Sequence, residues 1–199
     1  MVTISNVKVY DLKESVIACR NAMRLSPPEY TDAEFEASLP RAVSLANARV
    51  GSGHQNFLKG IRVSFDIVYP NYFSPELQRY NFIDIVTSSS KMHRLVKMDM
   101  DACFNKYVTA ESKAQMKRLI ERYNSVATDA NSEAMYVAFM GVLSNCPLGV
   151  ELFMRVSTNY LQLKTIFNQR KTHRLWEDWG AFCDFIRDLP YAKELITGE

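Results

Sequence analysis

The stretch IRVSFDIVYP, residues 61–70, has the clearest strand pattern in the sequence. Its apolar side chains occupy every second position, namely Ile61, Val63, Phe65, Ile67 and Tyr69. The positions between them include Arg62, Ser64 and Asp66. Because successive side chains of a β-strand point to opposite faces, this period of two predicts a strand with one face on the core.

Other segments around this strand have equally regular patterns. Strand character is present in TISNVKVYDL, residues 3–12, and in GVELFMRVST, residues 149–158. Helical spacing of apolar residues predicts helices over residues 14–23, 31–48, 74–80, 109–126, 131–147, 159–170 and 174–190. The sum is an α+β domain with more helix than strand.

Three of these helices carry specific expectations. Thr31 and Glu34 form a capping box at the start of the helix over 31–48, and Pro40 is expected to kink or split it. The helices over 109–126 and 131–147 form a plausible antiparallel pair. The apolar face of the helix over 174–190 comprises Leu175, Trp176, Trp179, Phe182, Phe185 and Ile186.

Composition limits the classes of protein to consider. The chain has 199 residues, of which 47% are hydrophobic, and contains no stretch typical of a linker, so we expect one domain over residues 1–199. The formal net charge is only +2, which gives no overall field for nucleic acid or a membrane surface. No apolar run is long enough to cross a membrane and MVTISNVKVYDL lacks the pattern of a secretory signal, so we expect a cytoplasmic protein.

Cysteine and histidine positions suggest no metal site. The four cysteines, Cys19, Cys103, Cys146 and Cys183, are scattered and contain no CxxC pair. This spacing favours reduced, mostly buried thiols over a zinc site or a disulfide framework.

The segment RYNFIDIVTSSSKMHR, residues 79–94, combines an apolar run with hydroxyl and basic side chains. The apolar run in the first half of this segment predicts a buried element. Its second half gathers hydroxyls beside cations at Ser88, Ser89, Ser90, Lys91 and Arg94. Such a cluster can bind a phosphate, but a solvated turn is an equally good interpretation.

Two further candidates have simpler structural interpretations. Asn159 and Arg170 are three helical turns apart and fall on one helix face, which is also what a core stripe with polar ends would give. His54 lies in a glycine-flanked turn, where a local hydrogen bond is the commoner role. From residue chemistry alone, the chain is a globular domain with a local anion site as its candidate feature.

Taken in order, these segments resemble the flavin-dependent thymidylate synthases over roughly residues 50–190. The stretch GSGHQNFLKGIRVSFDI, residues 51–67, occupies the place of a family element in which a histidine lies near the flavin, and His54 matches it. On the family's arginine-rich signature, Arg79 matches the first arginine, Ser89 the late serine and Lys91 the final arginine. Tyr80 and Asn81 stand where the family has His-Arg. Asp84, Val86 and Thr87 are further departures from the signature.

The C-terminal part, STNYLQLKTIFNQRKTHRLWEDW over residues 157–179, is the most specific match. It keeps, in the family's order, Asn159, Leu163, Arg170, His173, Trp176 and Glu177. Leu161 stands where the family has a second arginine, and Thr165 stands at another usual flavin contact.

The resemblance implies a single α+β domain with a central, mainly antiparallel sheet flanked by helices. It implies FAD as cofactor, held by His54, Arg79, Tyr80, Asn81 and Asn159. It implies a dUMP-like pyrimidine nucleotide held by Ser88, Ser89, Ser90, Lys91 and Arg170. Arg170 would also polarise the ring oxygens in catalysis. Reduced folate and NADPH are the implied co-substrates of a homotetramer.

The departures from the family pattern fall mainly among the residues expected to bind flavin. Among the residues expected to bind the nucleotide, Ser89, Lys91 and Arg170 keep more of the pattern. Three hypotheses therefore stay open. The first is a divergent thymidylate synthase or pyrimidine nucleotide methyltransferase. The second is a protein on the same scaffold that binds or sequesters a nucleotide without flavin or catalysis. The third is a flavin-dependent enzyme that acts on another pyrimidine or transfers another one-carbon group.

Overall fold

The computed structural model describes residues 1–126 and 132–199 and is built on one four-stranded sheet. The strands are β1 (Thr3–Tyr10), β2 (Arg62–Pro70), β3 (Asp84–Ser88) and β4 (Glu151–Asn159). Their order across the sheet is β1-β2-β4-β3, and every neighbouring pair is antiparallel. The α+β class and the antiparallel sheet expected from the sequence are therefore confirmed.

The alternating stretch of residues 61–70 forms β2, one of the two central strands. Val63, Phe65 and Ile67 are fully buried. The neighbouring strand β4 buries Met154 and Val156 on the same face, in register with β2. This face carries the main hydrophobic core.

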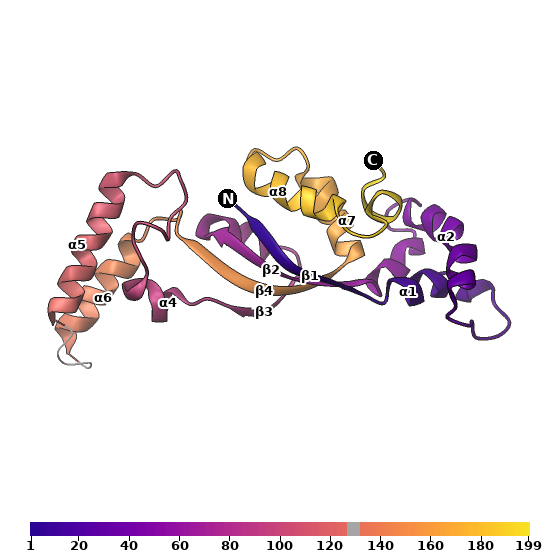
Figure 1. Cartoon of the computed structure of the whole chain (residues 1–199), viewed down its shortest axis with the longest axis horizontal. Coiled ribbons are helices and arrows are strands. Elements are labelled where there is room, and N and C mark those ends of the chain that lie inside the picture. Colours follow the sequence, from indigo (N-terminus) through magenta and orange to yellow (C-terminus); the bar gives the residue numbers. More distant parts are fainter. Residues whose placement is uncertain (127–131) are drawn as a thin grey trace.

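Two helices cover that face of the sheet, as Figure 1 shows in yellow and orange. They are α7 (Tyr160–Arg170), which follows β4 directly, and α8 (Trp176–Arg187). Phe65 of β2 packs against Phe182 and Phe185 of α8, with ring centroids 5.9 and 4.8 Å apart. Because each aromatic ring removes a large apolar area from water, this cluster anchors the helix layer on the sheet.

The N-terminal helices lie at one end of the elongated molecule (Figure 1). They are α1 (Leu12–Ala18) and α2 (Asp32–Ala46), and a 3-10 segment, His54–Lys59, packs against both. The expected cap is present, since Thr31 Oγ1 accepts a hydrogen bond from Glu34 N at 3.2 Å. The helix α2 continues through Pro40 instead of splitting there, because Phe35 on one side and Ala42 on the other are both buried in the same core.

The helical pair predicted in the middle of the chain lies at the opposite end (Figure 1). It consists of α5 (Ala110–Val126) and α6 (Glu133–Asn145), which pack against each other. Residue 131, where the second helix was expected to begin, lies outside the described residues. These helices share a second, smaller hydrophobic cluster with Leu95, Phe104 and Val150.

Two expectations about burial are wrong. The apolar run after Arg79 is not buried as a whole: Ile83 is in the core, but Phe82, before β3, and Val86, in this edge strand, are about 60% exposed. Trp176 is 71% exposed because it begins α8 at the end of the core, while Trp179, one turn later, is fully buried. The short helix expected over 74–80 is α3 (Ser74–Leu77), and α4 (Lys91–Arg94) is equally short.

Within the described residues, no helix is both long and apolar enough to span a membrane.

Candidate functional site

The helix α7 is the element around which the candidate residues gather. It begins where β4 ends, and Asn159 is its N-cap, with Oδ1 accepting a hydrogen bond from Gln162 N at 3.0 Å. Its inner face buries Leu163 and Ile166 in the core. Its outer face carries Leu161, Thr165 and Gln169, which are spaced four residues apart and so form one stripe.

Arg170 ends this helix in a tightly held network. Its Nε donates a hydrogen bond to Tyr80 Oη at 2.7 Å, and its Nη1 lies 2.9 Å from Glu76 Oε2. Its guanidinium carbon lies 4.6 Å from the centre of the buried Trp179 ring. The Tyr80 hydroxyl in turn donates a hydrogen bond to Gln169 Oε1 at 3.0 Å. The arginine is therefore fixed by an ion pair, a hydrogen bond and a cation–π contact.

An open depression of about 400 Å³ lies over this network. The structure brings together here four of the residues that the sequence assigned to a ligand: Arg79, Tyr80, Asn81 and Arg170. Phe82, Gln162, Thr165 and Gln169 complete its walls. Arg79 remains 69% exposed, and its Nη2 lies 3.6 Å from Glu76 Oε1. The depression thus combines two arginines with amide and hydroxyl groups.

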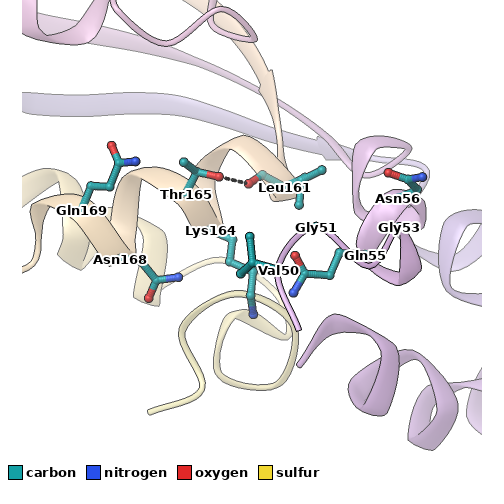
Figure 2. A pocket seen from close by; sticks show the side chains of 10 residues that line it. All are labelled: Val50, Gly51, Gly53, Gln55, Asn56, Leu161, Lys164, Thr165, Asn168 and Gln169. Atoms are coloured by element: carbon teal, nitrogen blue, oxygen red, sulfur yellow. Dashed lines mark hydrogen bonds between the residues drawn. The ribbon is translucent and has the colours of Figure 1, made fainter. Parts of the chain in front are cut away.

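A second cavity of about 480 Å³ adjoins the first along α7 (Figure 2). One wall is the loop of residues 50–56, which contributes Val50, Gly51, Gly53, Gln55 and Asn56. The opposite wall is α7, with Leu161, Lys164, Thr165, Asn168 and Gln169. Thr165 and Gln169 line both cavities, so the two form one continuous surface along the outer face of the helix.

Two residues predicted to bind the cofactor, His54 and Asn159, line neither of these two cavities. His54 lies in the loop of the second cavity, but its exposed side chain is not among those that line it. Asn159 uses its side-chain oxygen to cap α7. This cap gives Asn159 a local structural role, at the position where the sequence predicted the helix over 159–170 to begin.

The predicted phosphate cluster lies elsewhere on the chain. Ser88 ends β3, which pairs with β4 at Met154, five residues before Asn159. Ser89 pairs with the same strand, since its Oγ accepts a hydrogen bond from Phe153 N at 3.0 Å. Ser89 and Ser90 line a separate cavity of about 180 Å³ with Arg94. This cavity does not include Arg170, and the depression at Arg170 includes none of Ser88, Ser89, Ser90 and Lys91.

The described residues contain no group of three or more potential metal ligands. All four cysteines are free, and burial raises the pKa of each thiol, to about 11 for Cys103 and Cys183. They therefore stay protonated and weakly nucleophilic near neutral pH. Only Cys183 is fully buried and the other three are half-buried, which is less burial than we expected.

Solved structures share the fold of this chain. The sequence itself matches no family model and no curated protein. The structure resembles that of the flavin-dependent thymidylate synthase ThyX from Helicobacter pylori complexed with FAD and dUMP, at a TM-score of 0.68 and 14% identity over 99% of this chain and 98% of that one. The chain has the fold of a flavin-dependent thymidylate synthase.

A second example of this fold gives the same result. The UMP/dUMP methylase PolB from Streptomyces cacaoi, bound with 5-Br dUMP, matches at a TM-score of 0.63 and 13% identity. The match covers all of this chain and 95% of that one. Both similarities extend over the whole chain, so the thymidylate synthase fold includes residues 1–49, which the sequence resemblance did not reach.

Sequence reasoning missed three residues on or beside this surface. Glu76 was not recognised because its partner Arg170 is 94 positions away. Gln169 and Lys164 were not considered as site residues, although the spacing of Leu161, Thr165 and Gln169 would have predicted the outer stripe of α7.

Proposed function

We propose that this chain is a flavin-dependent thymidylate synthase-like protein. In this proposal it binds FAD and a dUMP-like pyrimidine nucleotide and transfers a one-carbon group reductively to C5 of the base. The observation that carries the proposal is the continuous surface along α7, with Arg79, Tyr80, Asn81 and Arg170 at one end. It lies on a fold whose solved examples are complexed with FAD and dUMP or with a dUMP analogue.

The residues present fit a flavin dinucleotide. The two adjoining cavities offer an extended groove, with hydroxyl and amide groups of Thr165 and Gln169 where they meet. Arg79 and Asn81 at one end and the loop of residues 50–56 at the other would hold the cofactor. When bound, reduced flavin supplies hydride for the transfer, with NADPH as the source of its electrons and a reduced folate as the one-carbon donor.

Arg170 has the central role of the protein in this proposal. Its Nε and Nη1 are directed to Tyr80 and Glu76, so its Nη2 is the nitrogen left to face a ligand in the depression. A fixed guanidinium stabilises negative charge that develops on a pyrimidine oxygen, because its dipoles need no reorganisation. Since the cofactor carries the chemistry, the protein needs no nucleophile, which agrees with its protonated thiols.

The separation of Ser88–Lys91 from Arg170 supports a site shared between subunits. In this proposal the serines and Lys91 of one protomer bind the phosphate of a nucleotide whose base lies at Arg170 of another, in a homotetramer. The sheet face opposite α7 and α8 leaves Phe153 half-exposed beside Val68, which is the kind of surface that a second copy covers. Light scattering on the purified protein tests this, and a monomer that binds nucleotide tightly would contradict it.

The experiment that tests the proposed function uses absorption and fluorescence together. A visible flavin band at roughly one cofactor per subunit supports the enzyme. Nucleotide binding can be followed by the fluorescence of Trp179, because the guanidinium of Arg170 stacks on its ring. The chain has two tryptophans, so Trp176→Phe, which removes the exposed one, leaves Trp179 as the only indole. Titration with dUMP is expected to change its fluorescence, and absence of both signals would refute the function.

The alternative is a protein that binds a nucleotide without flavin or catalysis. It is favoured by Asn159, which caps α7, and by Leu161, which stands where the resemblance expects an arginine. Colourless protein that cannot be reconstituted with FAD, yet is thermally stabilised by dUMP, would establish it.

A further inference from the structure

Glu76 contacts both arginines of the depression, one with each carboxylate oxygen. Its Oε2 lies 2.9 Å from Arg170 Nη1, and its Oε1 lies 3.6 Å from Arg79 Nη2. The carboxylate is 23% exposed and lies beside the depression without being part of its wall. Arg170 is the more firmly fixed of the two arginines, because Tyr80 and the Trp179 ring hold it as well.

The depression therefore carries less positive charge than its two arginines suggest. Of the described residues that line it, Arg79 and Arg170 are the charged ones. The remaining lining residues are neutral: Tyr80, Asn81, Phe82, Gln162, Thr165 and Gln169. Two guanidinium groups and the Glu76 carboxylate leave one positive charge at this place. A group with two negative charges, such as a phosphate monoester, would not be neutralised there.

An anion in the depression would also be repelled by Glu76 directly. Any anion that binds Arg170 lies one guanidinium group away from the carboxylate, which is too close for salt to screen the repulsion fully. The carbonyl oxygens of a pyrimidine accept hydrogen bonds from a guanidinium without bringing a net charge. The exposed ring of Phe82 in the wall suits such a flat ring as well. The depression thus favours the base of a nucleotide over its phosphate.

We propose that Glu76 determines which chemical group binds at Arg170, because it excludes dianionic groups and admits a neutral pyrimidine ring. This rests on the proposed function, in which the ligand is a dUMP-like nucleotide. Glu76 then fixes the orientation of that nucleotide, with its base at Arg170 and its phosphate outside the depression. Glu76 is a specificity-determining residue that acts through Arg170 and takes no part in the one-carbon transfer itself.

The test uses sulfate as the probe, because sulfate resembles a phosphate group and keeps two negative charges at neutral pH. Binding at Arg170 is followed by Trp179 fluorescence in the Trp176→Phe protein, at an ionic strength held constant with sodium chloride. The protein with Glu76 is expected to respond to deoxyuridine, which carries no phosphate, and not to sulfate. Glu76→Gln should bind sulfate at least about tenfold more tightly, because a nearby negative charge is removed.

Two control variants separate the charge of Glu76 from its packing. Glu76→Asp keeps the carboxylate on a shorter side chain and should still exclude sulfate. Glu36→Gln makes the same change in net charge at an exposed position of α2 and should leave the sulfate response unchanged. If Glu76→Gln does not fold, Glu76→Met, which is also uncharged, takes its place.

The outcomes distinguish this proposal from the proposed function. Equal sulfate binding with and without the Glu76 carboxylate, or an equal gain in Glu36→Gln, overturns the role of Glu76. A sulfate response of the protein with Glu76 that matches its response to deoxyuridine overturns it without any variant. If neither dUMP nor deoxyuridine changes the fluorescence, the pyrimidine part of the proposed function is refuted, while the sulfate comparison still decides whether Glu76 excludes dianions.

Discussion

Glu76 Oε2 lies 2.9 Å from Arg170 Nη1, so the arginine proposed to act on a pyrimidine is one half of an ion pair inside a partly buried network. The pair joins α3 to the end of α7 across 94 positions of sequence. The side chain of Arg170 is 12% exposed and that of Glu76 is 23% exposed. Solvent therefore screens their interaction only in part. The carboxylate orients the guanidinium at the wall of the depression.

Replacing Arg170 by alanine should therefore weaken both nucleotide binding and folding. We expect dUMP affinity to fall about 30-fold, or about 2 kcal/mol, as is typical for loss of a charge-assisted hydrogen bond. The melting temperature should also fall, because Glu76 and Tyr80 lose their partner. Calorimetric titration and thermal unfolding measure the two effects. Arg187→Ala changes the net charge equally at an exposed site and is the control; unchanged dUMP affinity in Arg170→Ala would show that the base binds elsewhere.

Variants of Asn159 can show whether this residue only caps α7 or also contacts the cofactor. Asn159→Ala should cost about 1 kcal/mol of unfolding free energy, because Gln162 N loses its acceptor. Asn159→Asp keeps an acceptor and should restore most of that stability. Thr31→Ala removes a comparable cap from α2 and is the stability control. If flavin affinity falls in Asn159→Ala by more than it does in Thr31→Ala, Asn159 contacts the cofactor as well as capping the helix.

The pairing of Asp66 predicts how stability depends on acid. Hydrogen bonds from Asn6, at 2.6 Å, and from Arg155, at 3.0 Å, hold the pKa of this carboxyl below its usual value. The folded pKa is thus lower than the unfolded one, near 4, so the stabilisation is complete above about pH 4 and is lost as pH falls through the folded pKa. Asp66→Asn should be less stable than wild type at pH 7, with a difference that shrinks below pH 4.

Denaturant unfolding at several pH values measures this difference. Asp188→Asn, which makes the same change in charge away from the cluster, is the matched variant. If the difference in unfolding free energy between wild type and Asp66→Asn stays constant from pH 7 to pH 3, the hydrogen bonds to Asp66 do not lower its pKa.

Two glycines give opposite predictions for the same substitution. A Cβ at Gly149 would lie 2.5 Å from Val108 Cγ2 and 2.8 Å from Asn105 Oδ1, so Gly149→Ala should destabilise the junction between β4 and the helical pair. A Cβ at Gly180, inside α8, would meet nothing within 4 Å. Gly180→Ala should therefore stabilise the protein by about 0.5–1 kcal/mol, because alanine loses less backbone entropy in a helix. Thermal unfolding of the two variants compares them directly; equal shifts would disprove the close approach at Gly149.

The local elements of this protein could be predicted from the sequence alone. The period of two at residues 61–70 predicted β2, the capping box at Thr31 predicted the start of α2, and helical spacing predicted α7 and α8 with Trp179 inside. These predictions succeed because which face of an element is buried depends on residues a few positions apart. The order of its motifs also identified the fold, although no sequence comparison did.

Which of these elements meet could be seen only in the folded chain. The fold placed Glu76 against Arg170 and joined two cavities through Thr165 and Gln169. It also separated Ser88–Lys91 from Arg170, although the resemblance assigned both to one nucleotide. The physical reason is that contacts between segments far apart in the chain follow from strand order and packing, which no local periodicity encodes.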